Sequence, residues 1–230
     1  MTSRRGAAAK EPLSQAAIVK AAHELLRRDG LEGMSLRKVA AVLETGPASL
    51  YAYVESLEEL EALVCDHALA AVKTKSAPQL GWRKRLSELL TAYLLVLMST
   101  PGLARLAMKT IAVGPNALRI LEALLGILEE GGVERGVAAW ASDLLTLHVT
   151  AIAAEQSERQ NRADPLLPAE RAIATVSPEL YPLISAARDD LFSGGGTERL
   201  AWALEVLISG ILSTPRPVAT RKARASKRKV

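Results

Sequence analysis

The sequence predicts an all-α protein with a small N-terminal head and a larger helical body. Hydrophobic residues make up 49% of the 230 residues and aromatic residues only 3%, so Leu, Ala, Val and Ile must fill the core. Leu and Ala favour helix, and the chain has no long alternating runs of β-branched residues. Apolar residues instead recur at i, i+3, i+4 and i+7, which is the spacing of one helix face.

The N-terminal part divides into an arm and three short helices. Residues 1–12 are small, basic and polar, and we expect a flexible arm. Ser14 is a candidate N-cap of the first helix, and Ser35 of the second. Pro47 suits the first position of a third helix, because its missing N–H would be unpaired there in any case. Residues 13–56 are therefore predicted to form one domain.

Residues 35–57 have the layout of a helix-turn-helix motif. An amphipathic segment and a tight turn precede a short segment in which Leu50 and Val54 face inward and Tyr51 and Tyr53 point elsewhere. In such a motif the second helix lies in the major groove of DNA while the first crosses the backbone. The alternative is an ordinary amphipathic helix pair on a solvated surface, because short patterns of this kind recur by chance.

The remaining chain is predicted to be a connecting helix, a body and a tail. Ser56 and Glu59 form a capping box that opens a connecting helix over residues 57–77. Residues 78–214 hold several apolar helices separated by Gly and Pro, and they are predicted to form the body. Residues 215–230 form a basic tail that we expect to be disordered.

Charge is distributed unevenly along the chain. The formal net charge is +4, but residues 216–230 hold seven basic side chains and no acidic one. Taking these 7 from the 29 basic residues leaves 22 against 25 acidic ones, so residues 1–215 sum to −3. The tail either adds sequence-independent affinity for DNA through counterion release or serves as a solubilising end.

Candidate catalytic and metal-ligating residues are few. His23, His67 and His148 lie on separate predicted helices, and none is at metal-ligand spacing. Cys65 is the one cysteine, so no internal disulfide is possible, and a buried packing role is the commoner outcome. The sequence has no phosphate-cradling glycine loop and no nucleophile elbow. We therefore expect no enzyme activity, no metal and no cofactor.

The sequence predicts a soluble, cytoplasmic protein without a membrane partner. The longest apolar run, residues 93–98, is far shorter than the ~20 residues of a membrane helix. No apolar run follows the basic residues at the N-terminus, so we expect no signal peptide.

Residues 35–57 resemble the TetR family of transcriptional repressors. The match is gapless and includes that family's recognition-helix pattern Leu-Tyr-x-(aromatic or His)-(Val or Phe), here Leu-Tyr-Ala-Tyr-Val at residues 50–54. It extends back over the first helix and forward over the fourth. In the body, residues 101–106, residues 114–118 and the terminal apolar helix look like a tetracycline-repressor-type C-terminal domain.

The resemblance implies a homodimer that binds a palindromic double-stranded DNA operator. It also implies that the dimer dissociates from the operator when a small molecule binds in the body. Ala48 is short enough to touch a thymine methyl, and Arg37 suits a guanine or a phosphate. Tyr51 and Tyr53 would reach the backbone or base edges, although they could also be half-buried tyrosines. The DNA-binding residues carried over by the resemblance are Leu36, Arg37, Pro47, Ala48, Ser49, Tyr51 and Tyr53.

Two positions in and after the motif depart from the family pattern. Glu44 stands where the family usually has Gly, so either Glu44 takes a left-handed conformation, at ~1 kcal/mol, or Gly46 moves the turn. Leu57 stands where the family usually has a phosphate-binding Lys. Acidic residues also crowd this end of the head, so we expect few phosphate contacts from it, supplemented by the basic arm. These acidic residues are Glu55, Glu58, Glu59 and Glu61.

The body is expected to bind an unknown small-molecule effector. Apolar helices with isolated polar groups are what a drug-sized pocket needs, although core packing or surface exposure is the simpler role for any one residue. The low aromatic content favours an aliphatic ligand over a flat, stacked one. The candidate ligand-binding residues are His67, Tyr93, Met98, Met108, Asn116, His148 and Gln156.

Two predicted helices are too apolar to face water, and we expect them to form a four-helix dimer interface. A two-fold interface also matches two half-sites one DNA turn apart. Burial within a monomer is the alternative. The candidate interface residues are Leu144, Leu147, Ala151, Leu200, Leu204, Leu207, Ile208 and Ile211.

The main functional alternative is an architectural or constitutive DNA-binding dimer without a small-molecule ligand. A helical interaction module that never touches DNA is a further alternative.

Overall fold

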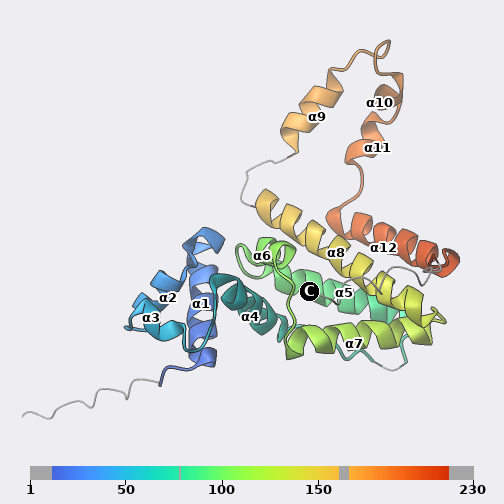
Figure 1. Cartoon of the computed structure of the whole chain (residues 1–230). Helices are drawn as coiled ribbons and strands as arrows, with labels where there is room; N and C mark the ends of the chain where they lie inside the picture. The colour runs from blue at the N-terminus through green and yellow to red at the C-terminus, as the bar shows by residue number, and fades with distance from the viewer. Residues whose placement is uncertain (1–11, 78, 161–165, 218–230) are drawn as a thin grey trace, which may run out of the picture.

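The computed structural model describes residues 12–77, 79–160 and 166–217, and all regular structure within these ranges is helical. The predicted all-α fold is confirmed for this part of the chain. Figure 1 shows a small N-terminal head beside a larger body, with a helical extension that projects from the body. Nearly all of the predicted N-terminal arm, and most of the predicted basic tail, lie outside the described residues.

The head consists of α1 (Gln15–Asp29), η1 (Leu31–Gly33), α2 (Leu36–Val42) and α3 (Pro47–Leu50). Ser14 and Ser35 cap α1 and α2 as predicted, because each hydroxyl accepts a hydrogen bond from a backbone N–H three residues further on. Gly30 has a φ of 69° and its N–H closes the last turn of α1. The head core is fully buried and includes Ile18, Ala22, Leu26, Val39 and Leu50.

The body is built from α5 (Trp82–Met98), α6 (Leu103–Lys109), α7 (Pro115–Glu130), α8 (Arg135–Gln160) and α12 (Gly196–Ser213). The helix α8 packs against each of the other four. Its Leu145, Val149 and Ala153 are fully buried, as is Leu90 of α5. Aliphatic side chains therefore fill this core, as the low aromatic content predicted.

By length and composition alone, α8 would be apolar enough to cross a membrane over Arg135–Arg159. The contacts of α8 with α5, α6, α7 and α12 make it the central helix of the body. Its unburied face nevertheless keeps large apolar side chains, among them Trp140 and Leu147.

The extension comprises three short helices, α9 (Leu167–Ala174), α10 (Pro182–Ala186) and α11 (Arg188–Phe192). They contact one another and project away from the body (Figure 1). None of their residues is buried. The guanidinium of Arg199 on α12 donates to the carbonyls of Leu191 and Ser193, which ties the end of the extension to the start of α12.

The head and the body are joined by α4 (Leu57–Leu69), which contacts α1 on one side and α5, α6 and α7 on the other. Its N-cap is Ser56, as predicted, with the hydroxyl accepting from the N–H of Glu59. The helix is shorter than the predicted segment 57–77. The guanidinium of Arg119 on α7 binds the carbonyls of Leu69, Ala70 and Val72, at and just after the last residue of this helix.

A second contact between head and body lies where η1 meets the start of α6. Gly102 precedes α6 with a φ of 81°, and a Cβ at this position would lie 2.8 Å from the backbone nitrogen of Leu31. Beside this contact, Arg105 on α6 lies 3.4 Å from the carboxylate of Glu32 in η1. The absence of a side chain at Gly102 therefore lets the body approach the head backbone.

The helices α1 and α4 also meet through two imidazole rings. The ring centroids of His23 and His67 are 5.2 Å apart in an edge-to-face arrangement. Burial lowers the pKa of His23, and the neighbouring His67 lowers it further. His23 is therefore neutral near pH 7, so the contact between the two rings places no charge on the His23 side chain of α1.

We expect Gly102→Ala to lower the free energy of unfolding by at least about 1 kcal/mol. A non-glycine residue in the left-handed region costs about 1–2 kcal/mol, and the new Cβ would also collide with Leu31. Gly126→Ala is the matched control, because Gly126 lies within α7, a Cβ there would meet open space, and helix propensity favours Ala. Denaturant unfolding of both variants checks this, and equal stability of the two would contradict it.

Candidate nucleic-acid interface and body cavity

The turn between α2 and α3 depends on a left-handed residue. Glu44 has a φ of 51°, whereas Gly46 has a φ of −81°. Of the two alternatives that the sequence left open, Glu44 therefore takes the left-handed conformation, at about 1–2 kcal/mol. The N–H of Thr45 then donates to the carbonyl of Ala40 at 2.9 Å, which closes the turn.

The short helix α3 is held by two apolar side chains. Leu50 and Val54 are buried in the head core, as predicted. The carbonyl of Tyr53 accepts a hydrogen bond of 3.1 Å from the side-chain amide of Gln15 on α1, so the end of the segment is also fixed. A helix of one turn is not stable alone, and these contacts set its orientation.

The residues predicted to face DNA lie together on the outside of the head. Tyr51 is 57% exposed and Tyr53 is 38% exposed. Pro47, Ala48, Ser49 and Arg37 are exposed as well, while Leu36 is half-buried beneath them against the core. The structure thus exposes short side chains on α3, two tyrosines directly after it and a guanidinium from α2.

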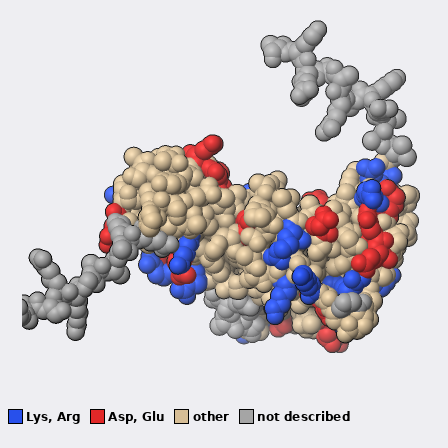
Figure 2. All heavy atoms as spheres, turned by 90° about the horizontal axis from the view of Figure 1, so that it is seen from below, with Lys and Arg blue, Asp and Glu red and all other residues tan. Residues whose placement is uncertain are grey.

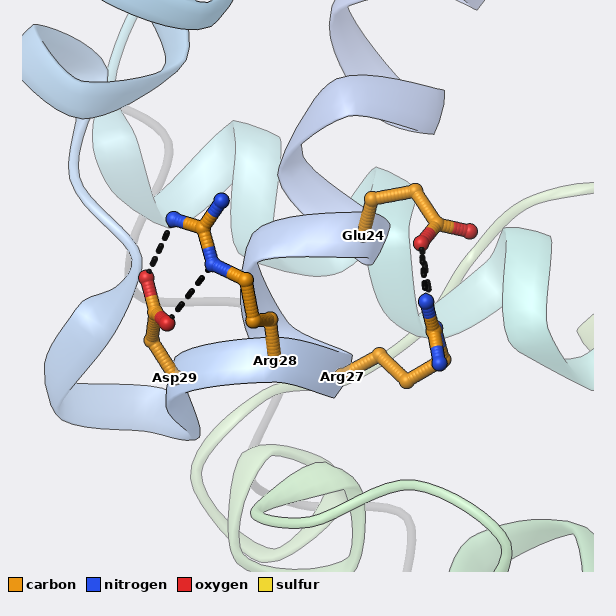
Figure 3. Close-up of polar contacts among 4 residues, drawn as sticks. All are labelled: Glu24, Arg27, Arg28 and Asp29. Atoms are coloured by element: carbon orange, nitrogen blue, oxygen red, sulfur yellow. Dashed lines mark hydrogen bonds and ion pairs between the residues drawn. The ribbon is translucent and has the colours of Figure 1, made fainter.

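The basic side chains of the head lie on α1 and α2. At the end of α1, Arg27 binds Glu24 and Arg28 binds Asp29 (Figure 3). These hydrogen bonds lower the pKa of both carboxyl groups. The pairs are exposed and contribute little to stability. Arg37 and Lys38 are the basic residues of the motif itself.

One face of the head carries few charged side chains. Seen from below, this face is a broad area of uncharged side chains with Lys and Arg, and also Asp and Glu, at its edges (Figure 2). Glu55 and Glu58 follow α3 and are exposed. Leu57 is half-buried at the start of α4, where the family pattern usually has a Lys. This arrangement is consistent with few phosphate contacts.

The body has a cavity of about 560 Å³, open to solvent on one side, between α4, α5, α6, α7 and α8. Its wall is mainly aliphatic, and its polar groups are Tyr93, Lys109, Thr110, Ser142, Asp143, Thr146 and Thr150. The hydroxyls of Tyr93 and Thr150 lie 3.0 Å apart and share a hydrogen bond, and burial raises the pKa of Tyr93. The cavity thus combines a large apolar wall with hydroxyl groups that can orient a bound molecule.

Of the predicted ligand-binding residues, Tyr93 and Met108 line this cavity. His67 packs against His23, and Asn116 binds Asp66 at the edge of the body. Neither belongs to the lining, and the same is true of Met98, His148 and Gln156. Periodicity could not separate these residues, because a cavity wall and a packed core use the same apolar face.

Several lining residues were missed by sequence reasoning. Leu118 and Leu121 of α7 are exposed and line the cavity, and Ile120 and Leu124 line it from buried positions. Lys109 was also missed. Its ammonium lies 2.7 Å from the buried carboxylate of Glu61 on α4, so a cation beside the cavity is tied to the connecting helix.

Cys65 lines the cavity from α4 and is buried. Burial raises the pKa of its thiol to about 11, and the nearby Asp66 adds to this effect. The thiol is therefore protonated at neutral pH and is a poor nucleophile. Within the described residues no group of three or more His, Cys, Asp or Glu side chains could hold a metal ion.

The predicted interface residues divide between two faces of α8 and α12. Leu200, Leu204 and Ile208 are buried within this chain, where α12 packs on α8, and Leu207 and Ile211 are half-buried. Leu144, Leu147 and Ala151 on α8 are exposed. Exposed residues on these helices that sequence reasoning missed are Trp140, Trp202, Val206 and Leu212.

The fold and the motif have counterparts among known proteins. Residues 76–214 match the family model described as the tetracyclin repressor-like C-terminal domain. The HTH-type transcriptional repressor DrrR1 of Streptomyces coeruleorubidus is 28% identical over 225 residues, which cover 90% of this chain and 83% of that protein. The tetracycline repressor of class A from transposon 1721 of Escherichia coli is 26% identical, covering 84% of this chain and 88% of its own.

Solved structures show the same likeness. The ligand-free structure of ActR from Streptomyces coelicolor has a TM-score of 0.80 and 31% identity, covering 89% of this chain and 97% of its own. ActR is also known in complex with actinorhodin. Since the family model matches more than half of the chain and ActR exceeds 30% identity over most of it, the chain belongs to the TetR family of transcriptional regulators.

Proposed function

We propose that this regulator is a ligand-responsive repressor that binds a palindromic operator as a homodimer in the cytoplasm. The observation that carries the proposal is that α4 packs on the head through α1 and also lines the body cavity through Cys65 and Leu69. A molecule bound in the cavity would touch the helix on which the head rests. The effector would release the operator only if it bound the protein more tightly in one position of α4 than in the other.

The exposed surface of α3 supplies the chemistry for reading DNA. Ala48 and Ser49 are short and exposed, so they can approach base edges in the major groove. Arg37 on α2 can bind a guanine or a phosphate, and the hydroxyls of Tyr51 and Tyr53 can donate to phosphate oxygens. Pro47 at the start of α3 is exposed as well, and Leu36 packs partly buried against the core.

The second copy would cover the exposed apolar faces of α8 and α12. Trp202 is 71% exposed and Trp140 is 57% exposed, and Leu144 and Leu147 lie on the same helix as Trp140. Large exposed apolar patches on soluble proteins mark interaction sites. A two-fold pairing through these helices would present two recognition segments to two half-sites.

The effector that suits the cavity is a drug-sized, largely apolar molecule with oxygen groups. Aliphatic walls would cover its surface, while Thr146, Thr150 and Ser142 could bond its oxygens. ActR, whose structure with actinorhodin is known, is a relative of this chain, so actinorhodin is a reasonable first compound to test. The cavity favours this proposal over a constitutive DNA-binding dimer, which would not need one.

The proposed function is tested by selecting duplexes from a random-sequence DNA pool with the full chain. We expect palindromic duplexes to be enriched. Tyr51→Phe and Tyr53→Phe should each weaken binding to the selected duplex by roughly fivefold, because each loses a hydrogen bond of about 1 kcal/mol. Tyr181→Phe in the extension is the matched control, since Tyr181 is also exposed but lies far from the head. Unchanged affinity in both α3 variants would remove the assignment.

The dimer is tested by sedimentation at micromolar concentration. We expect a dimer for the unmodified chain and a monomer for Trp202→Glu, because a buried unpaired charge opposes association. Val42→Glu is the control, since Val42 is an exposed apolar residue of the head, away from α8 and α12. A monomeric unmodified chain would refute the homodimer.

Effector binding is tested by thermal unfolding with actinorhodin and then with a metabolite library. A compound present at about 100 times its Kd should stabilise the fold by about 2.7 kcal/mol. We expect Leu121→Trp, which fills the cavity, to abolish this shift while leaving the DNA affinity measurable. If no compound stabilises the unmodified chain, the constitutive DNA-binding dimer becomes the better account.

A further inference from the structure

The side chain of Asp66 on α4 caps the N-terminus of α7. Its carboxylate accepts hydrogen bonds from the backbone N–H of Ala117 at 2.8 Å, the backbone N–H of Asn116 at 3.4 Å and the Asn116 side-chain amide at 3.0 Å. Asp66 is only 6% exposed. A carboxylate at a helix N-terminus pairs the free N–H groups and interacts favourably with the helix dipole.

Arg119 on α7 makes the reverse contact at the C-terminus of α4. Its guanidinium donates to the carbonyls of Leu69, Ala70 and Val72, and to the hydroxyl of Thr74, at 2.9 to 3.4 Å. The last carbonyls of a helix have no partner within the helix, and a positive charge there is favourable. The two helices therefore cap each other, and we call these contacts the reciprocal caps.

Gly114 makes the first of these caps possible. A Cβ at this position would lie 2.3 Å from the carboxylate carbon of Asp66. Its φ of −82° is accessible to any residue, so the requirement here is space rather than backbone conformation. The chain before α7 thus passes directly against the Asp66 side chain. This close contact leaves little room for α4 and α7 to shift sideways relative to each other.

The reciprocal caps lie next to the cavity. From α4, Cys65 and Leu69 line it, and Cys65 precedes Asp66 directly in sequence. From α7, Ala117 lines it, and the N–H of this residue donates to Asp66. A molecule that displaces the cavity wall at α7 would therefore move the atoms to which α4 is bonded.

We propose that Asp66 and Arg119 are the positioning residues that fix the tilt of α4 relative to α7, and so set the separation of the two heads. This inference rests on the proposed function, because head separation matters only for a dimer on two half-sites. The caps lie about one turn apart where the end of α4 meets the start of α7, and two points of attachment resist rotation better than a single bond. Loss of either cap leaves the junction of α4 and α7 with a single cap beside apolar packing, and apolar packing has no preferred direction.

The first experiment measures the spacing preference of the full chain for DNA, and it needs no effector. The selected palindromic duplex and versions with one base pair inserted or removed between the half-sites are compared. We expect the unmodified chain to prefer one spacing by about tenfold or more, within the usual range of coupling between sites. Asp66→Ala and Arg119→Gln should reduce that preference to about threefold or less, while affinity for a single half-site is unchanged.

The second experiment measures head separation directly, without DNA. A spin label is attached at Lys20→Cys on the exposed side of α1, and the distance between labels in the dimer is recorded. Cys65 is buried with a pKa raised to about 11, so it reacts poorly with the label. We expect a narrow distance distribution for the unmodified caps and a broader one for both cap variants.

Arg85→Gln is the matched control for both experiments. It also removes a guanidinium from a contact with α7, at Glu130, but the contact joins the far end of α7 to α5 and does not involve α4. Circular dichroism confirms that each variant is folded. Arg119 is only half-buried, so the result for Arg119→Gln decides the test if Asp66→Ala fails to fold.

The outcomes separate the two proposals. If the unmodified chain enriches no palindromic duplex or gives no dipolar signal, the proposed function itself fails, and this inference fails with it. If the unmodified chain does both, but the cap variants keep its spacing preference and its narrow distance distribution, the reciprocal caps are overturned and the proposed function stands. The same loss in Arg85→Gln as in the cap variants would also overturn them.

Discussion

The packing of α4 against α1 on one side and against α5, α6 and α7 on the other is the constraint on which the arrangement of the molecule depends. One face of this helix completes the head core with Leu60 and Val64, which are fully buried, and another supplies Cys65 and Leu69 to the cavity wall. A helix shared in this way cannot move in the body without moving the head. The polar contacts of Glu61 with Lys109, and of Asp66 with α7, make that connection directional.

The recognition segment illustrates how a very short helix can present function. α3 spans Pro47–Leu50 and is too short to be stable alone. Burial of Leu50 and Val54 fixes it, and the same geometry turns Tyr51 and Tyr53 outward. Stability and recognition therefore come from opposite faces of one turn. The left-handed Glu44 adds a local cost that the packing of the head offsets.

The helical caps and the helix-turn-helix segment could be predicted because they depend on neighbouring residues. Ser14, Ser35 and Ser56 act on N–H groups three residues away, so the cap and its partner appear together in the sequence. The cavity could not be predicted in the same way. Leu118 and Leu121 have the helical spacing of core residues, but whether that face meets a neighbouring helix or a cavity depends on where α8 lies. The same reason explains why His148 and Gln156 were poor candidates for its lining.

The sequence by itself determined the all-α class, the order of head and body, and the outward direction of the tyrosines, because each follows from local propensity or from periodicity along one helix. Only the tertiary structure decided which apolar faces pack together and which remain open to a second copy. It also decided that Asp66 and Arg119 cap helices distant from their own positions in the chain. The physical reason is that the sequence of one helix does not specify which other helix its apolar face will pack against. Its partner is chosen when all the helices pack together and the buried polar groups must find hydrogen bonds.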